Sequence, residues 1–124
     1  MAWSIDSRIP VTFMPDMAAL DAALAAGPAT AILVEAPAPP GPTTATAIAE
    51  FVPVAPHVAG CACCGGRSPA AVALDRLFQA RMRGKCGWFE RVVVLAPTPA
   101  GRAAVRAALD ADALTAARFR QAGG

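Results

Sequence analysis

The chain has 124 residues, 56% of them hydrophobic, and a formal net charge of +2 at pH 7. This length predicts a single domain, residues 1–124, large enough to bury a core. The charge is too small and the arginines too scattered to indicate nucleic-acid binding. The N-terminus lacks a basic region followed by an apolar run, and no apolar run approaches the ~20 residues of a membrane span. A cytoplasmic location, where thiols stay reduced, is therefore expected.

The first part of the chain predicts two strands with a helix between them. Residues 8–13, RIPVTF, are rich in β-branched side chains, and residues 30–36, TAILVEA, form the near-continuous apolar run of a buried parallel strand. Between them, Met17, Leu20 and Leu24 have the spacing of one apolar helix face. This pattern predicts a β-α-β unit.

Proline dominates the middle of the chain. Residues 37–44, PAPPGPTT, predict a loop, because proline fixes φ and removes a backbone donor. A short helix over residues 44–50 and a strand over residues 51–55 are expected to follow. Pro53 places that strand at a sheet edge or a bulge.

The second half predicts a helix, a strand and a broken helix. Ser68 as N-cap and Pro69 at the first helical position begin the helix. Its apolar face is expected to contain Leu74, Leu77, Phe78 and Met82. Residues 90–97, ERVVVLAP, form the clearest strand, which should be central. Residues 100–120 predict two helical pieces that break near residues 110–112.

This alternation predicts an α/β fold with three layers: a mostly parallel sheet of about four strands, with helices on both faces. In such sheets, functional sites lie at the carboxyl ends of the strands. The stretch GCACCGGR, residues 60–67, follows the predicted strand over residues 51–55. It should therefore lie at such an end.

Three of the four cysteines, Cys61, Cys63 and Cys64, lie within this stretch between glycines. Zinc and Cu(I) favour thiolate ligands, and zinc takes four ligands in a closed site. His57 lies four residues before Cys61 and is the candidate fourth ligand. Cys86, water or a group from a second chain are the alternatives. The sequence therefore predicts a metal site.

Other interpretations of the thiols remain open. Cys61 and Cys64 have the C-x-x-C spacing of a redox dithiol, but the helix begins only at Ser68, too far for its dipole to activate them. The thiols could also simply pack. One histidine, no clustered carboxylates and no triad indicate that the protein is not an enzyme.

The residues from Gly60 to Arg120 resemble the CobW family of metal-linked P-loop GTPases. Members of that family carry Gly-Cys-x-Cys-Cys after a strand, then a helix, a Phe-Asp-Arg-hydrophobic strand and a helix with a basic-aromatic end. The counterparts are GCACC, WFERVVVL and the stretch from Leu114 to Arg120. IPVTF and TAILVEA resemble the first two strands of the family. The resemblance covers nearly the whole chain but only the first half of the family's GTPase domain.

The chain departs from the family at every nucleotide-binding element. The only lysine, Lys85, has Gln79 where the first P-loop glycine belongs and Cys86 where a Ser or Thr belongs. Leu95 and Thr98 stand where the family has a Glu and a nucleotide-sensing Gly. The chain contains no Asn, so it has no guanine-reading Asn-Lys-x-Asp. The resemblance thus implies a truncated relative, half of a P-loop GTPase-like domain, that binds no nucleotide.

The sequence therefore predicts a small zinc- or copper-binding protein, a carrier or sensor, without GTPase activity or catalytic residues. The alternative is a non-catalytic interaction module, a pseudo-GTPase relic with no bound metal. A homodimer or a partner protein is expected, because truncation would expose a sheet edge that must be blunted or paired.

Overall fold

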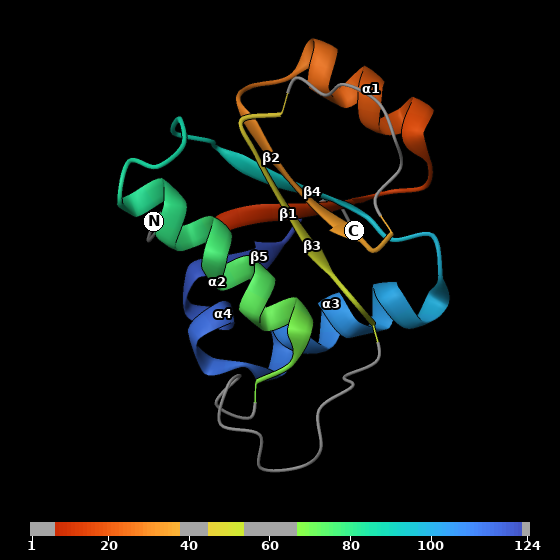
Figure 1. Ribbon diagram of the computed structural model, residues 1–124, viewed down its shortest axis with the longest axis vertical. Coiled ribbons are helices and arrows are strands. Elements are labelled where there is room, and N and C mark those ends of the chain that lie inside the picture. Colours follow the sequence, from red (N-terminus) through yellow and green to blue (C-terminus); the bar gives the residue numbers. More distant parts are fainter. Residues whose placement is uncertain (1–6, 38–44, 54–66, 123–124) are drawn as a thin grey trace, which may run out of the picture.

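The computed structural model describes residues 7–37, 45–53 and 67–122. They form a five-stranded sheet in the order β3-β2-β4-β1-β5, in which every neighbouring pair is parallel (Figure 1). The elements in chain order are β1 (Ile9–Met14), α1 (Met17–Ala26), β2 (Thr30–Glu35), β3 (Ala47–Phe51), α2 (Pro69–Met82), β4 (Arg91–Leu95), α3 (Pro99–Ala111), α4 (Ala113–Arg118) and β5 (Phe119–Gln121). The predicted α/β fold with a parallel sheet is confirmed.

Helices cover both faces of this sheet. Figure 1 shows α1 on one side and α2, α3 and α4 on the other. Because side chains of a strand point alternately to opposite faces, β4 serves two cores. Val92 and Val94 join the larger core with α2 and α3, and Val93 and Leu95 join the smaller core with Leu20 of α1. The central strand β4 is therefore buried on both faces.

The crossover connections run in opposite directions from the centre of the sheet. From β1 the chain passes through α1 to β2 on one side of β4, and from β4 it passes through α3 and α4 to β5 on the far side of β1. Their helices lie on opposite faces, as connections of one handedness require. The adjacent strands β1 and β4 thus flank a topological switch point, where α/β proteins bind ligands.

The two apolar runs form the interior strands. Every residue of β2 is buried, and β4 is the third of the five strands, so the predicted central position of VVVL is confirmed. A strand flanked by neighbours and covered by helices on both faces needs apolar residues at consecutive positions. This is the pattern that residues 30–36 and 90–97 show.

The longest described helix, α2, begins as predicted. Ser68 Oγ accepts a hydrogen bond from Ala71 N at 3.2 Å, and Pro69 occupies the first turn. Leu74 and Leu77 are buried, but Met82 is 56% exposed, so its predicted place on the apolar face is wrong. Met82 is the last residue of α2. No helix in the described ranges is long and apolar enough to cross a membrane.

The helix predicted over residues 44–50 is wrong, because β3 occupies residues 47–51 instead. The alanines there favour a helix locally, but their backbone pairs in register with β2, from Ala47 opposite Ala31 to Phe51 opposite Glu35. Alternate side chains of β3 pack on the larger core under α2. Pairing and packing thus override local propensity. β3 is an edge strand, as expected, but it ends at Phe51, so the bounds predicted for this strand, residues 51–55, are wrong.

The fifth strand is the reason that the predicted count of four is too low. Residues 119–121, expected to end a helix, form β5 and pair with β1 from Ile9 opposite Phe119. Phe119 is 1% exposed and meets Phe78 edge to face, with ring centroids 6.2 Å apart. Burial of this aromatic ring holds the short strand in place.

The predicted break between two helical pieces is confirmed at Asp112, which separates α3 from α4.

Candidate functional site

The predicted metal ligands Cys61, Cys63, Cys64 and His57 lie outside the described residues. The described chain leaves the sheet at the carboxyl end of β3 and resumes at Arg67, immediately before α2. Both points belong to the carboxyl edge of the sheet, since α2 starts there to return to the amino end of β4. We call residues 54–66 the cysteine segment; the described residues on both sides of it lie at the edge where sites of this fold class are found.

The first tether is the end of β3. Phe51 is 3% exposed, and its carbonyl oxygen accepts a hydrogen bond from Ala36 N at 2.8 Å. This bond extends the pairing of β2 and β3 to the last residue of the strand. The chain therefore enters the cysteine segment from a fixed position.

The second tether is an ionic cluster around Arg67. Its Nε and Nη2 donate to the two carboxylate oxygens of Asp112 at 2.9 and 3.1 Å, and its Nη1 lies 3.8 Å from Asp75 Oδ2. Arg118 donates to the other oxygen of Asp75. The hydrogen bond from Arg67 lowers the pKa of Asp112 to about 2, and the same bond raises the pKa of Arg67. Two-pronged pairing of this kind fixes position as well as charge.

Asp112 also caps α4, so its replacement should be costly in two ways. Its Oδ1 accepts from Thr115 N at 3.0 Å. We expect Asp112→Ala to lower the free energy of unfolding by about 3 kcal/mol, through the lost cap and the two lost hydrogen bonds from Arg67. Asp112→Asn keeps a capping oxygen and should cost about 1 kcal/mol. Urea unfolding at neutral pH measures both, with Asp110→Asn, an exposed neighbour, as control.

The ion pair between Arg67 and Asp112 makes the free energy of unfolding depend on pH in the acid range. The pKa of Asp112 is lowered from 3.8 to about 2, so its stabilising effect is complete above about pH 4 and is lost as the pH falls through 2. The difference between wild type and Asp112→Asn should therefore shrink between these pH values. A difference that stays constant down to pH 2 would contradict the ion pair.

Cys86 lies away from these tethers. It is half-buried, packs against the larger core and is a free thiol. It follows α2, whose 14 residues span about 21 Å, whereas Cys64 lies three residues before Arg67 and can reach only about 10 Å from it. This geometry disfavours Cys86 as a fourth ligand within one chain. The described residues contain no group of three or more His, Cys, Asp or Glu side chains that could hold a metal ion.

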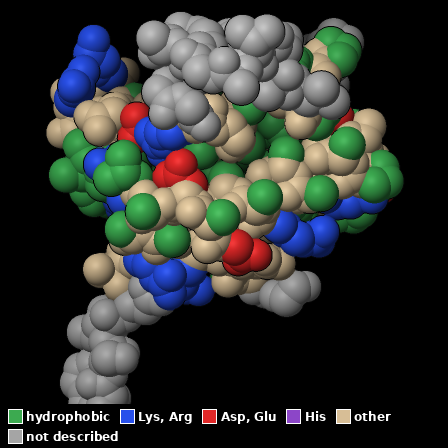
Figure 2. All heavy atoms as spheres, turned by 90° about the horizontal axis from the view of Figure 1, so that it is seen from below, with side chains coloured by type: hydrophobic (Ala, Val, Ile, Leu, Met, Phe, Trp, Pro, Cys, Tyr) green, Lys and Arg blue, Asp and Glu red, His purple; other side chains and the backbone are tan. Residues whose placement is uncertain are grey.

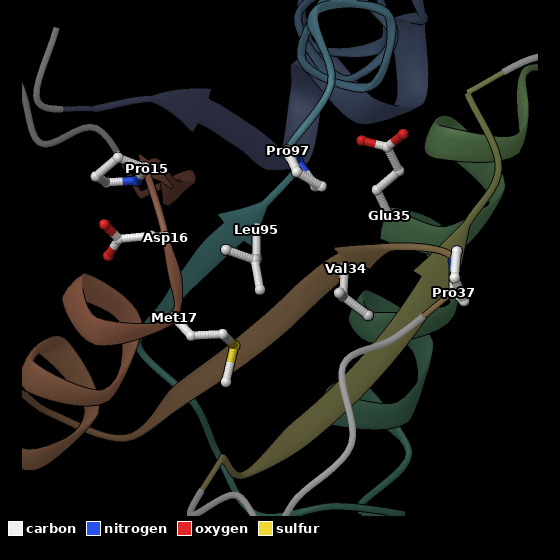
Figure 3. A pocket seen from close by; sticks show the side chains of 8 residues that line it. All are labelled: Pro15, Asp16, Met17, Val34, Glu35, Pro37, Leu95 and Pro97. Carbon is white, nitrogen blue, oxygen red and sulfur yellow. The ribbon is translucent and has the colours of Figure 1, made fainter.

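A cavity of about 210 Å³ opens beside the switch point at the carboxyl edge. Figure 3 shows the side chains that line it, with apolar contributions from Met17, Val34 and Leu95. The complete lining is Pro15, Asp16, Met17, Val34, Glu35, Pro37, Leu95 and Pro97. Ligand pockets usually have volumes of about 300–1,000 Å³, so this cavity by itself lies below the usual range.

Carboxylates lie at the N-termini of two helices at this edge, α1 and α3. Asp16 Oδ1 accepts from Ala19 N at 2.8 Å in the first turn of α1. At α3, the carboxylate of Glu35 accepts from Thr98 N at 3.2 Å and from Thr98 Oγ1 at 2.7 Å. A carboxylate therefore lies beside each of these two N-termini, where a phosphate would otherwise be favoured.

Glu35 is a buried acidic residue at the carboxyl edge of the sheet, and it was not among the candidate site residues expected from the sequence. It is 6% exposed and is the one buried carboxylate of the described residues. A Cβ added at Gly101 would lie 2.1 Å from Glu35 Oε1, so the glycine leaves room for the carboxylate. The signal in the sequence was a single acid that ends an apolar run, with Thr-Pro-x-Gly after the neighbouring strand.

Titration with nucleotide should give no binding. We expect isothermal titration calorimetry with GTP or ATP and magnesium to show only heat of dilution at micromolar protein, because the chain has no P-loop and because Asp16 and Glu35 place carboxylates at the N-termini of α1 and α3. Saturable heat with one-to-one stoichiometry would contradict this prediction.

The face seen in Figure 2 carries Lys and Arg side chains in several separate places, with acidic and hydrophobic side chains between them. No broad basic surface is visible there for a polyanion.

Comparison with known proteins adds no relative. No family model, no curated protein and no solved structure matches the chain.

Proposed function

We propose that this chain is a small metal-binding protein that holds one Zn²⁺ or Cu(I) through Cys61, Cys63 and Cys64, with His57 as the fourth ligand. It would act as a metal carrier or sensor, without GTPase activity. The observation that carries this proposal is the crowding of three thiols into four residues between glycines. Thiolates are the ligands that both ions prefer, and glycines allow the tight turns that adjacent ligands need.

The two tethers support this proposal. Phe51 and Arg67 fix the ends of the cysteine segment on the carboxyl edge of the sheet. A segment held at both ends loses less entropy on closing around an ion than a free tail would. The proposal includes a reducing compartment such as the cytoplasm, because free thiols are required for binding.

Competition with a chromogenic chelator tests the proposal. Reduced wild-type protein should withdraw zinc or Cu(I) from the chelator at one ion per chain. Binding should release protons, because the thiols must ionise. Failure to withdraw either ion would refute metal binding and leave the non-catalytic interaction module in its place.

We also propose that the chain forms a homodimer. β3 is an edge strand, and Ile48 and Val52 at this edge are 49% and 40% exposed. An exposed edge with apolar side chains is a template for pairing with another strand, and two-fold dimers are the commonest oligomers. Light scattering that shows a monomer at high concentration, with and without zinc, would rule this out.

A further inference from the structure

The most exposed large hydrophobic side chains of the described residues lie near the junction of α2 and β4. Trp88 is 59% exposed and Met82 is 56% exposed. Trp88 precedes the fully buried Phe89, so the backbone that carries it is anchored in the core. A large aromatic ring left in solvent on an anchored backbone is typical of a binding surface.

Arg81 holds the indole of Trp88 in place. Its guanidinium carbon lies 3.6 Å from the centroid of the Trp88 ring and 5.3 Å from that of Phe89. Its Nε is buried and has no hydrogen-bond partner among the described residues. Burial lowers the pKa of Arg81, while Cys86 and Glu90 act in the opposite direction. The partly buried guanidinium of Arg81 therefore fixes the position of the indole through stacking.

The turn that follows α2 is well ordered by backbone contacts. Lys85 N donates to Ala80 O at 2.9 Å, and Gly84 adopts a φ of +69°, a conformation that glycine tolerates at no steric cost. A turn fixed in this way has little freedom left to lose when a partner binds. The exposed side chains of Arg83 and Lys85 flank it.

Charge at this junction is predominantly positive. Arg81, Arg83 and Lys85 are basic, and Glu90 is the one acid between residues 81 and 90. We name Arg81, Met82, Arg83, Lys85 and Trp88 the Trp88 platform. Aromatic, Met and Arg side chains, which make up most of this surface, are enriched in protein–protein interfaces, whereas Lys is depleted there.

We propose that the Trp88 platform docks an acidic segment of a partner protein, one that carries an aromatic, Leu or Met side chain between carboxylates. The apolar side chain would pack on the open face of the indole, and the carboxylates would pair with the surrounding cations. Three cations with a carboxylate beside them fit a short acidic peptide better than a nucleic acid, which needs a longer row of phosphate contacts. This inference does not depend on metal binding, because the platform lies at the opposite end of α2 from the cysteine segment.

Selection from a library of short displayed peptides tests this inference on the full chain. Peptides are selected on wild-type protein under reducing conditions and counter-selected on the support without protein. The recovered peptides should share at least one aromatic, Leu or Met residue flanked by Asp or Glu. Their affinities are then measured by fluorescence polarisation.

The substitutions at Trp88 and Lys85 should weaken peptide binding to different extents. Trp88→Ala should weaken binding at least about tenfold, the loss typical of a central aromatic anchor. Lys85→Glu, at an exposed position, should weaken it about threefold, and high salt should weaken it further. Matched controls are Leu114→Ala, at a side chain 47% exposed on α4, and Arg106→Gln, at an arginine stacked 4.8 Å from Phe13. Both controls should bind as wild type does.

Several outcomes would overturn the inference. They are recovered peptides without acidic residues, equal binding to wild type and Trp88→Ala, and a charge reversal at Lys85 that changes nothing. Oligothymidylate or vesicles of anionic phospholipid that bind through Trp88 more tightly than the peptides would assign the surface to a different class of partner.

Discussion

Replacement of Cys63 and Cys64 by serine is expected to abolish metal binding. The double substitution leaves Cys61 as the only thiol among residues 57–64, and one thiolate with one imidazole cannot form a closed zinc site. The variant should withdraw no zinc from a chelator that the reduced wild-type protein competes with. It should also lose the proton release that accompanies binding.

Cys86→Ser is the matched control for this experiment. It removes one thiol from the same chain at a position about 20 Å along α2 from the tether at Arg67. Most of the metal binding should remain. A Cys86→Ser variant that loses binding as completely as the double variant would mean that the thiols act together, within one chain or across a dimer.

Replacement of Gly101 by alanine is expected to lower the free energy of unfolding by about 2 kcal/mol. The new Cβ would displace the carboxylate of Glu35, which would then lose its two hydrogen bonds from Thr98. Hydrogen bonds to a charged group contribute about 1.5–3 kcal/mol, and the higher helix propensity of alanine returns about 1 kcal/mol. Chemical denaturation measures the difference.

A double-mutant cycle isolates the cause. When Glu35 is first replaced by alanine, Gly101→Ala should be neutral or should stabilise by up to about 1 kcal/mol. The two substitutions are therefore expected to be strongly non-additive. If Gly101→Ala costs the same in both backgrounds, the contact between Gly101 and Glu35 does not explain the glycine.

The capping signals show how far local sequence predicts this fold. Ser68 followed by Pro69 predicts the start of α2 because both residues act within one turn of chain. The start of α3 has the same chemistry in Thr98 and Pro99, and its cap accepts from Gly101 N at 2.9 Å. Such signals need no tertiary contact, so they can be read directly.

The candidate site was predictable only in part, because some of its contacts join residues that are far apart in the sequence. The thiol cluster is visible in sequence because its members are adjacent, but Glu35 and Thr98 lie 63 residues apart and meet only when β2 and β4 pair. The tether from Arg67 to Asp112 spans 45 residues in the same way. Neither periodicity nor spacing in the sequence predicts that two such distant residues will be in contact in the folded sheet.

The sequence by itself determined the α/β class, the central place of β4 and the start of α2, because apolar runs and caps act over a few residues. Only the tertiary structure decided that residues 47–51 form β3 rather than a helix and that residues 119–121 add β5. Alanine prefers a helix in isolation, yet backbone pairing with β2 and packing under α2 outweigh a preference of less than about 1 kcal/mol per residue. Burial of Phe119 against Phe78 likewise stabilises β5. A strand of three residues is too short for a local sequence pattern to predict.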